Sequence, residues 1–128
     1  MALEETLNNL PGSFDLVHGF NISWEYTMLA GWHFAQVRQL PFVATPFTHF
    51  GVKGADRVAR NSTMAHQLQM LSSAASILTL TTIEREGLIE WGLDATKIAV
   101  IWGGIEPLPA VETAVSTLPP SQPPMSFI

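Results

Sequence analysis

Two of the four histidines, His18 and His49, stand where a run of apolar residues typical of a buried strand comes to its end. An imidazole at such a place can donate a hydrogen bond to a hydroxyl, accept one, or stabilise charge that develops during a reaction. The alternative is a histidine that only satisfies backbone groups of the nearby loop. His33 and His66 fall inside helical patterns, and we interpret them as surface or packing residues.

Several common kinds of site are excluded by the residue types and their spacing. No two histidines are four residues apart, as a zinc site on a helix requires. The chain has no cysteine, no Gly-x-Gly-x-x-Gly turn and no phosphate loop. Neither Ser23 nor Ser62 has the glycine frame of a hydrolase nucleophile. We therefore expect no bound metal and no cofactor.

One predicted helix carries three carboxylates, Glu84, Glu86 and Glu90. Glu86 and Glu90 are like charges four residues apart, which is more typical of a solvated helix face than of a catalytic pair. Thr81 and Glu84 have the spacing of a capping box, in which each side chain covers a backbone N–H at the start of the helix.

The composition bounds the class of protein. The 128 residues fit one domain, and 47% of them are hydrophobic while only 13% are charged. About a quarter charged is usual, so we expect much of the apolar surface to face other domains or chains. A net charge of -5 with six basic residues gives no footprint for nucleic acid. The chain starts without a secretory signal and lacks a long apolar run, which favours a cytoplasmic protein.

One surface feature suggests a contact with the cytoplasmic membrane face. Phe47 and Phe50 stand beside the basic residues Lys53, Arg57 and Arg60. Apolar tips next to basic side chains could touch an anionic membrane or a lipid-linked substrate. The alternative, which we favour, is a loop that packs on a neighbouring helix.

Strand and helix patterns alternate along the chain. Strands are predicted over residues 14–20, 42–45, 76–80 and 97–102, and helices over 22–39, from 55, and from 81. Asn21 or Ser23 can cap the first long helix. Apolar strands separated by amphipathic helices indicate an α/β fold, with a Rossmann-like parallel sheet and helices on both faces. Ligands of such sheets bind beyond the carboxyl ends of the strands, which is where His18 and His49 fall.

The order of these segments resembles the N-terminal domain of the family 4 glycosyltransferases. "ILTLTTIEREGLIEWGLDATKIAVIWGGIEP" is similar to a family segment in which a strand ends on Ser or Thr and opens a helix. That segment then passes a Gly-x-x-x-x-Lys-Ile turn and rises to Asn-Gly-Ile/Val-Asp. "FDLVHGF" and "PFVATPFTHFG" resemble two upstream strands of the family. The resemblance covers residues 14–107.

The resemblance implies a two-domain enzyme of the GT-B type, hexosyltransferase-like in its full-length form. Its N-terminal domain would bind the acceptor, and its C-terminal domain a nucleotide-diphosphate sugar. Transfer would retain the anomeric configuration without a metal ion. His49 would be catalytic, and His18, Asn21 and Thr48 would bind the acceptor. The cleft and hinge residues would be Thr81, Gly103, Gly104 and Glu106.

The sequence departs from the family pattern at Gly103, where the family has asparagine. We expect residues 1–106 to form a partial N-terminal domain, 107–124 a Pro-rich interdomain linker, and 125–128 a truncated start of the donor-binding domain. The chain would then be a fragment, inactive without its missing C-terminal domain in cis. The alternatives are a stand-alone Rossmann-like module that binds a small ligand or a protein, and a fragment with no activity.

Overall fold

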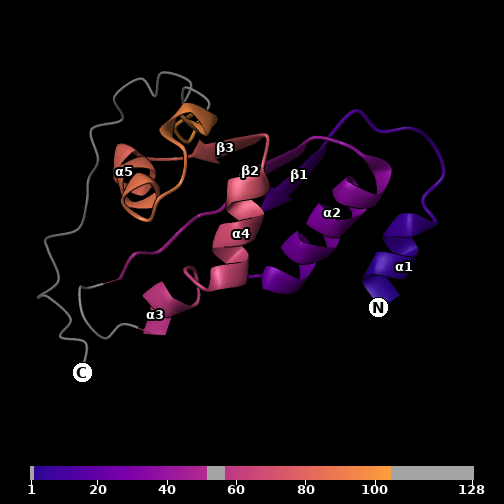
Figure 1. Ribbon diagram of the computed structural model, residues 1–128, viewed down its shortest axis with the longest axis horizontal. Helices are drawn as coiled ribbons and strands as arrows, with labels where there is room; N and C mark the ends of the chain where they lie inside the picture. Colours follow the sequence, from indigo (N-terminus) through magenta and orange to yellow (C-terminus); the bar gives the residue numbers. More distant parts are fainter. Residues whose placement is uncertain (1, 52–56, 105–128) are drawn as a thin grey trace, which may run out of the picture.

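The computed structural model of the chain describes residues 2–51 and 57–104 (Figure 1). Its elements in chain order are α1 (Ala2–Asn8), β1 (Val17–Phe20), α2 (Glu25–Arg38), β2 (Phe42–Thr45), α3 (Arg57–Arg60), α4 (Ala65–Ser73), β3 (Ser76–Thr79), α5 (Thr82–Glu90), a 3-10 turn (Ala95–Lys97) and β4 (Ile98–Val100). The predicted linker, the residues 125–128 and the side chains of Lys53 and Glu106 lie outside the described residues.

The four strands form one parallel sheet in the order β1-β2-β3-β4. In this register Gly19 lies opposite Ala44, Ala44 opposite Ile77, and Ile77 opposite Ile98. The strand at Phe42–Thr45 has the predicted bounds, while the other three are shorter than predicted. The structure confirms an α/β, Rossmann-like fold with an all-parallel sheet.

The helices that connect the strands lie on one face of this sheet. Alternation along each strand assigns Val17, Phe42, Ala44, Ile77 and Ile98 to the face that packs against α2, α4 and α5. The other face carries His18, Phe20, Val43, Leu78 and Ala99, which are half-buried or exposed. Among the described residues, the expected helices on both faces are therefore found on one. The reason is that successive right-handed crossovers place every helix on the same side when neighbouring strands follow in sequence order.

The core lies between the sheet and these three helices. Met28 from α2, Met70 and Leu71 from α4, Ile77 from β3 and Leu88 from α5 are each at most 1% exposed. They pack in the same cluster as Phe42 and Ile98. Burial of this apolar surface is the main force that holds the helices on the sheet.

Gly19 allows β1 to approach α2 closely. A Cβ atom at Gly19 would lie 2.8 Å from the Phe42 ring and 3.1 Å from Cγ of Met28. Any larger residue would therefore push the first strand away from its neighbours in the core.

Helix α2 begins three residues later than predicted, and neither Asn21 nor Ser23 caps it. Its N-cap is Trp24, which makes no side-chain cap hydrogen bond. Asn21 instead adopts a left-handed backbone conformation with φ of 64°, and its Oδ1 accepts a hydrogen bond from the Ser23 N–H at 3.2 Å. The asparagine thus closes a local turn that competes with the start of a helix.

The predicted second helix is divided into α3 and α4. The buried side chain of Gln67, in the first turn of α4, donates to the Asn61 carbonyl at 2.7 Å and to the Ile22 carbonyl at 3.4 Å. Its Oε1 accepts from the Met64 N–H at 3.0 Å. One amide side chain therefore satisfies backbone groups on both sides of the break.

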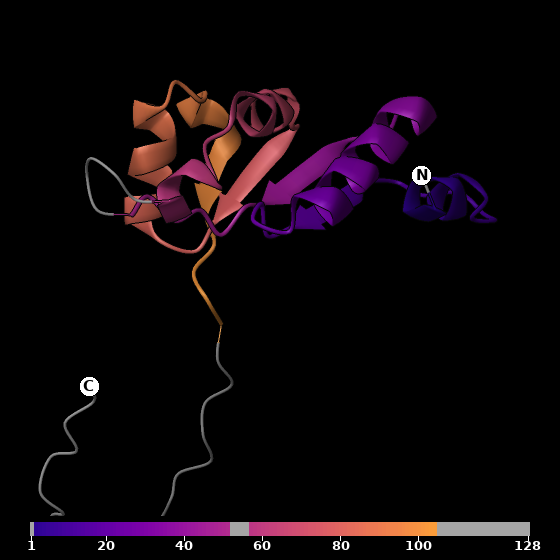
Figure 2. The same ribbon diagram turned by 90° about the horizontal axis from the view of Figure 1, so that it is seen from below.

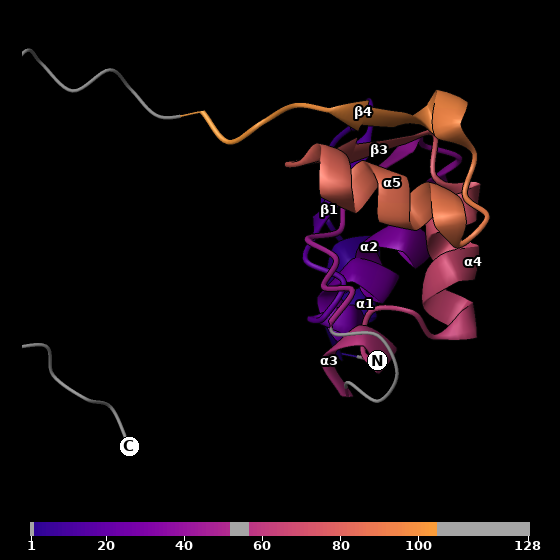
Figure 3. The same ribbon diagram turned by 90° about the vertical axis from the view of Figure 1, so that its left-hand side faces the viewer.

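Helix α1 packs on the outer side of α2, away from the strands (Figure 2). At the opposite end of the described chain, β4 is directed away from α4, and residues 101–104 continue in that direction (Figure 3). This places the last described residues beyond the carboxyl edge of the sheet.

Candidate functional site

The loops that follow β1 and β2 run together at the carboxyl edge of the sheet. The Asn21 N–H donates to the Thr45 carbonyl at 3.0 Å, and the Ile22 N–H donates to the Pro46 carbonyl at 2.8 Å. The ladder between β1 and β2 thus continues past both strand ends. This brings residues 20–22 next to the loop that carries Thr48 and His49.

His18 lies within β1 and faces the side of the sheet away from the helices. Its Nε2 is 2.8 Å from Oγ1 of Thr45, which is buried, and its ring is 4.0 Å from the ring of Phe20. Burial lowers the pKa of His18 below its ordinary value, so the imidazole favours its neutral form. One ring nitrogen is engaged by Thr45, which leaves Nδ1 for another partner.

The loop after β2 turns at Phe47, and the side chains that follow are buried at Thr48 and exposed at His49. Phe47 has a left-handed φ of 50°, and its ring lies 6.4 Å from that of Phe20. Thr48 is only 8% exposed, and its Oγ1 is buried without a hydrogen-bond partner among the described residues. His49, the next residue, is exposed. The expected catalytic imidazole therefore projects outward from a loop whose neighbouring residue is buried.

The buried carboxylate of Glu84 joins two of the strand ends. One oxygen accepts from the Thr48 N–H at 2.6 Å, and the other accepts from the Leu80 N–H at 3.1 Å. Glu84 is 7% exposed. Hydrogen bonds from backbone N–H groups to a carboxylate are among the stronger kinds in proteins. The capping spacing indicated that Glu84 binds backbone at the helix start, but it gave no signal that this residue also reaches Thr48.

Phe50 packs inward on α5. Its ring lies 4.7 Å from the ring of Trp91 in an edge-to-face arrangement, over a position in α5 that glycine occupies. Phe50 was one of the residues suggested to touch a membrane. Its packing on α5 agrees instead with the alternative that we favoured, a loop that packs on a neighbouring helix. Arg57 and Arg60 are exposed on α3.

Thr81 and the two glycines after β4 have clear structural settings. Thr81 is the N-cap of α5, and its Oγ1 accepts from the Glu84 N–H at 3.0 Å, which confirms this half of the capping box. Gly103 and Gly104 are exposed, and a Cβ at either would meet no atom within 4 Å. The left-handed residue at this exit is Trp102, with φ of 51°. Trp102 therefore supplies the left-handed conformation of this turn, and the backbone angles at Gly103 and Gly104 do not require glycine.

The structure brings some of the predicted site residues together and leaves others apart. Thr48 and Thr81 both contact Glu84, and Asn21 is hydrogen-bonded to the end of β2. None of the described interactions joins His49 to His18. Phe20 was not singled out from the sequence, yet it is 52% exposed and lies between the rings of His18 and Phe47. The sequence pattern that could have identified Phe20 is an aromatic residue at the end of a predicted strand.

The described residues hold no group of three or more side chains suited to a metal ion. Within the same residues, no helix is both long and apolar enough to cross a bilayer.

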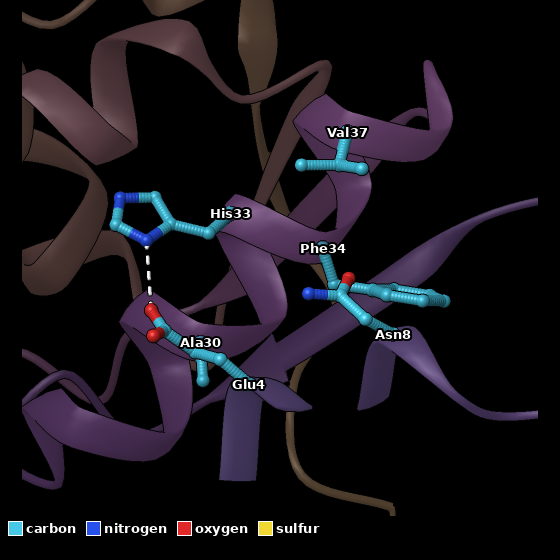
Figure 4. A pocket seen from close by; sticks show the side chains of 6 residues that line it. All are labelled: Glu4, Asn8, Ala30, His33, Phe34 and Val37. Carbon is cyan, nitrogen blue, oxygen red and sulfur yellow. Dashed lines mark hydrogen bonds and ion pairs between the residues drawn. The ribbon is translucent and has the colours of Figure 1, made fainter. Parts of the chain in front are cut away.

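Hollows on the surface of the described residues differ in their relation to the strand ends, as a comparison of two of them shows. One, between α1 and α2, is drawn in Figure 4; His33 there is hydrogen-bonded to Glu4 at 3.0 Å. It lies on the outer side of α2, remote from the carboxyl edge. The other, of about 310 Å³, lies beside α5 and the end of the His49 loop. Its lining residues are Phe50, Gly51, Ile83, Glu86, Gly87, Glu90 and Trp91.

Comparison with known proteins matches the whole described part of the chain to one family. The family described as "Glycosyl transferase 4-like domain" matches residues 2–104. No curated protein matches the sequence significantly.

Proposed function

Since the chain belongs to the glycosyl transferase 4-like domain family, we propose that residues 2–104 form the acceptor side of a retaining glycosyltransferase. The full reaction would move a sugar from a nucleotide-diphosphate donor to an acceptor hydroxyl. The bond from the anomeric carbon to the diphosphate breaks, and a bond to the acceptor oxygen forms on the same face of the sugar. The acceptor proton leaves with the diphosphate. The observation that carries this proposal is the family match over the whole parallel sheet.

The assignment to the acceptor side is supported by what stands at the carboxyl edge. The loops at this edge carry the neutral hydrogen-bonding groups of Asn21 and Thr48 and the exposed His49, and His18 lies two residues before the end of β1. Such groups suit the hydroxyls of a sugar, while the sequence has no glycine-rich turn to hold a diphosphate. Donor contacts would come from a second domain of the GT-B type.

Each proposed site residue has a role that its setting allows. The exposed His49 imidazole is free to bond the reacting sugar and to stabilise charge there. The Thr48 hydroxyl is buried and unpaired among the described residues, so it would bond a ligand hydroxyl only if binding displaced the atoms that cover it. His18 offers its remaining ring nitrogen, and the exposed ring of Phe20 beside it offers a flat surface for the C–H face of a sugar. No metal ion is needed for these roles.

Sugar binding to the isotopically labelled chain tests the proposal. Methyl glucoside and methyl mannoside represent acceptors, and UDP-glucose and GDP-mannose represent donors. We expect the glycosides to shift the NMR signals of Asn21, Thr48 and His49, with little effect from the nucleotide sugars. His49→Gln should weaken glycoside binding about tenfold, the effect of losing one good hydrogen bond to a ligand.

The matched control is His33→Gln, which alters a histidine on the outer side of α2 and should leave binding unchanged. If no glycoside moves the signals of the carboxyl edge, the acceptor assignment is wrong. Sugar transfer by the chain alone, detected by mass spectrometry of the product, would instead show that the donor site is also present. Binding of an unrelated ligand at the same edge would favour the stand-alone module.

A further inference from the structure

We propose that one face of α5 is built to position His49, and that Glu84 and Gly87 are its positioning residues. The proposal rests on the proposed role of His49 at the reacting sugar. Glu84, Gly87 and Trp91 are spaced by three and four residues, so they lie on one side of the helix and its C-cap. The same side faces the loop after β2, which runs beside α5 (Figure 1).

The first contact of this face holds the residue before His49. The Thr48 N–H donates to Glu84 at 2.6 Å, across 36 residues of sequence. The second oxygen of the carboxylate is bound to the Leu80 N–H at the end of β3. Because Leu80 directly follows β3 and Glu84 lies in the first turn of α5, Glu84 ties the loop to the end of a sheet strand.

The second contact holds the residue after His49. A Cβ atom at Gly87 would lie 2.4 to 2.7 Å from three atoms of the Phe50 ring, which is closer than carbon atoms approach. The glycine thus leaves room for the Phe50 ring to lie on the helix. The Trp91 ring packs against the Phe50 ring edge-to-face, with 4.7 Å between the ring centroids. Phe50 is thereby fixed against α5 by shape.

His49 is held between these two contacts while its own side chain stays exposed. Fixing the backbone on both sides restricts the positions that the imidazole can reach, without using any atom of the ring. A group that acts on a substrate gains from this, because placement within a few tenths of an ångström is set before the substrate binds.

NMR of the full chain tests the proposal without any sugar. The ring signals of His49, identified by their loss in His49→Gln, report its surroundings, and exchange of the Thr48 amide reports its hydrogen bond. In Glu84→Ala we expect the Thr48 amide to exchange roughly tenfold faster or more, the equivalent of a hydrogen bond to a charged group. Glu84→Gln keeps one acceptor oxygen and should lie between Glu84→Ala and the wild type.

Gly87→Ala tests the second contact and should shift and broaden the His49 ring signals. Gly31→Ala is its matched control, since Gly31 is also inside a helix. A Cβ atom at Gly31 would have Cγ1 of Val17 as its nearest neighbour, at an ordinary contact distance of 3.5 Å. Glu86→Gln controls for the loss of a carboxylate from the same helix. Both controls should leave His49 and Thr48 as in the wild type.

The proposal predicts effects centred on His49, with the His33 and His66 signals unchanged. A structural role alone would lower stability and leave the His49 signals in place, and that outcome in Gly87→Ala would overturn the proposal. If Glu84→Ala does not fold, Glu84→Gln and Gly87→Ala decide between the same outcomes. Because no sugar is used, a positioned His49 in a chain that binds no glycoside would contradict only the proposed function.

Discussion

His18 is the residue whose setting bears most directly on pH. It lies in the sheet against Thr45 and Phe20, and burial lowers its pKa below the value in the unfolded chain. At pH values well above 6.5 the imidazole is neutral in both states. As the pH falls through 6.5, the unfolded chain binds the proton more readily than the folded one, so stability falls.

We therefore predict that His18→Gln reduces the loss of stability on acidification. The measurement is the free energy of unfolding in urea at pH 7.5 and at pH 5.5, for the wild type and the variant. His33→Gln, which changes an exposed histidine paired with Glu4, serves as the control. An equal pH dependence in wild type and His18→Gln would show that burial of this imidazole has no effect on stability.

At the same scale, Trp102 and the buried Glu84 show that the role of a residue depends on its position in the fold. Trp102 takes the left-handed conformation that its neighbouring glycines could have taken more easily. Glu84 is buried where its neighbours Glu86 and Glu90 are exposed. Glu84 accepts hydrogen bonds from two backbone N–H groups, which meets the condition for burying a carboxylate.

Helix α5 combines three roles in nine residues. Leu88 faces the core, Glu84 and Gly87 face the loop with His49, and Ile83 is 73% exposed. The start of the helix is fixed by Thr81, whose hydroxyl covers the Glu84 N–H. Because that N–H belongs to the residue that holds Thr48, the cap and the loop contact share one turn of helix.

Two adjacent threonines should therefore differ when each is changed to alanine. Thr81→Ala removes the cap and should lower the free energy of unfolding by about 1 kcal/mol, within the usual range of roughly 0.5–2 kcal/mol. Thr82→Ala, at the first helical position and exposed, should change it by less than about 0.5 kcal/mol. Thermal unfolding measures both changes in stability. Equal changes in Thr81→Ala and Thr82→Ala would mean that the cap adds no more stability than an exposed threonine in the helix.

Across the whole molecule, the fully sequential strand order has one main consequence. Every crossover helix lies on one face, so the described part of the chain has a covered side and a side where Phe20 and Ala99 are exposed. The described surface also exposes the apolar side chains of Trp24 and Ile101. The core itself needs only the covered side.

Because the buried hydrophobic cluster of the described residues falls between Ile22 and Ile98, we predict that residues 1–104 fold without the rest of the chain. Removing 105–128 should change the free energy of unfolding by no more than about 0.5 kcal/mol, the usual limit for changes away from buried groups. Urea unfolding of both lengths measures this. A shortened chain that no longer unfolds cooperatively would place part of the core beyond Gly104.

The sequence by itself determined the order of the four strands and of the long helices between them, and it placed Asn21, Thr48 and His49 after strands. Hydrophobic spacing and helix caps act over a few residues, so strand 42–45 and the Thr81 cap were predictable. The tertiary structure alone decided that the helices share one face, that His18 lies within its strand, and that Glu84 holds Thr48. These features depend on strand order and on contacts across 27 or 36 residues, which no local pattern encodes.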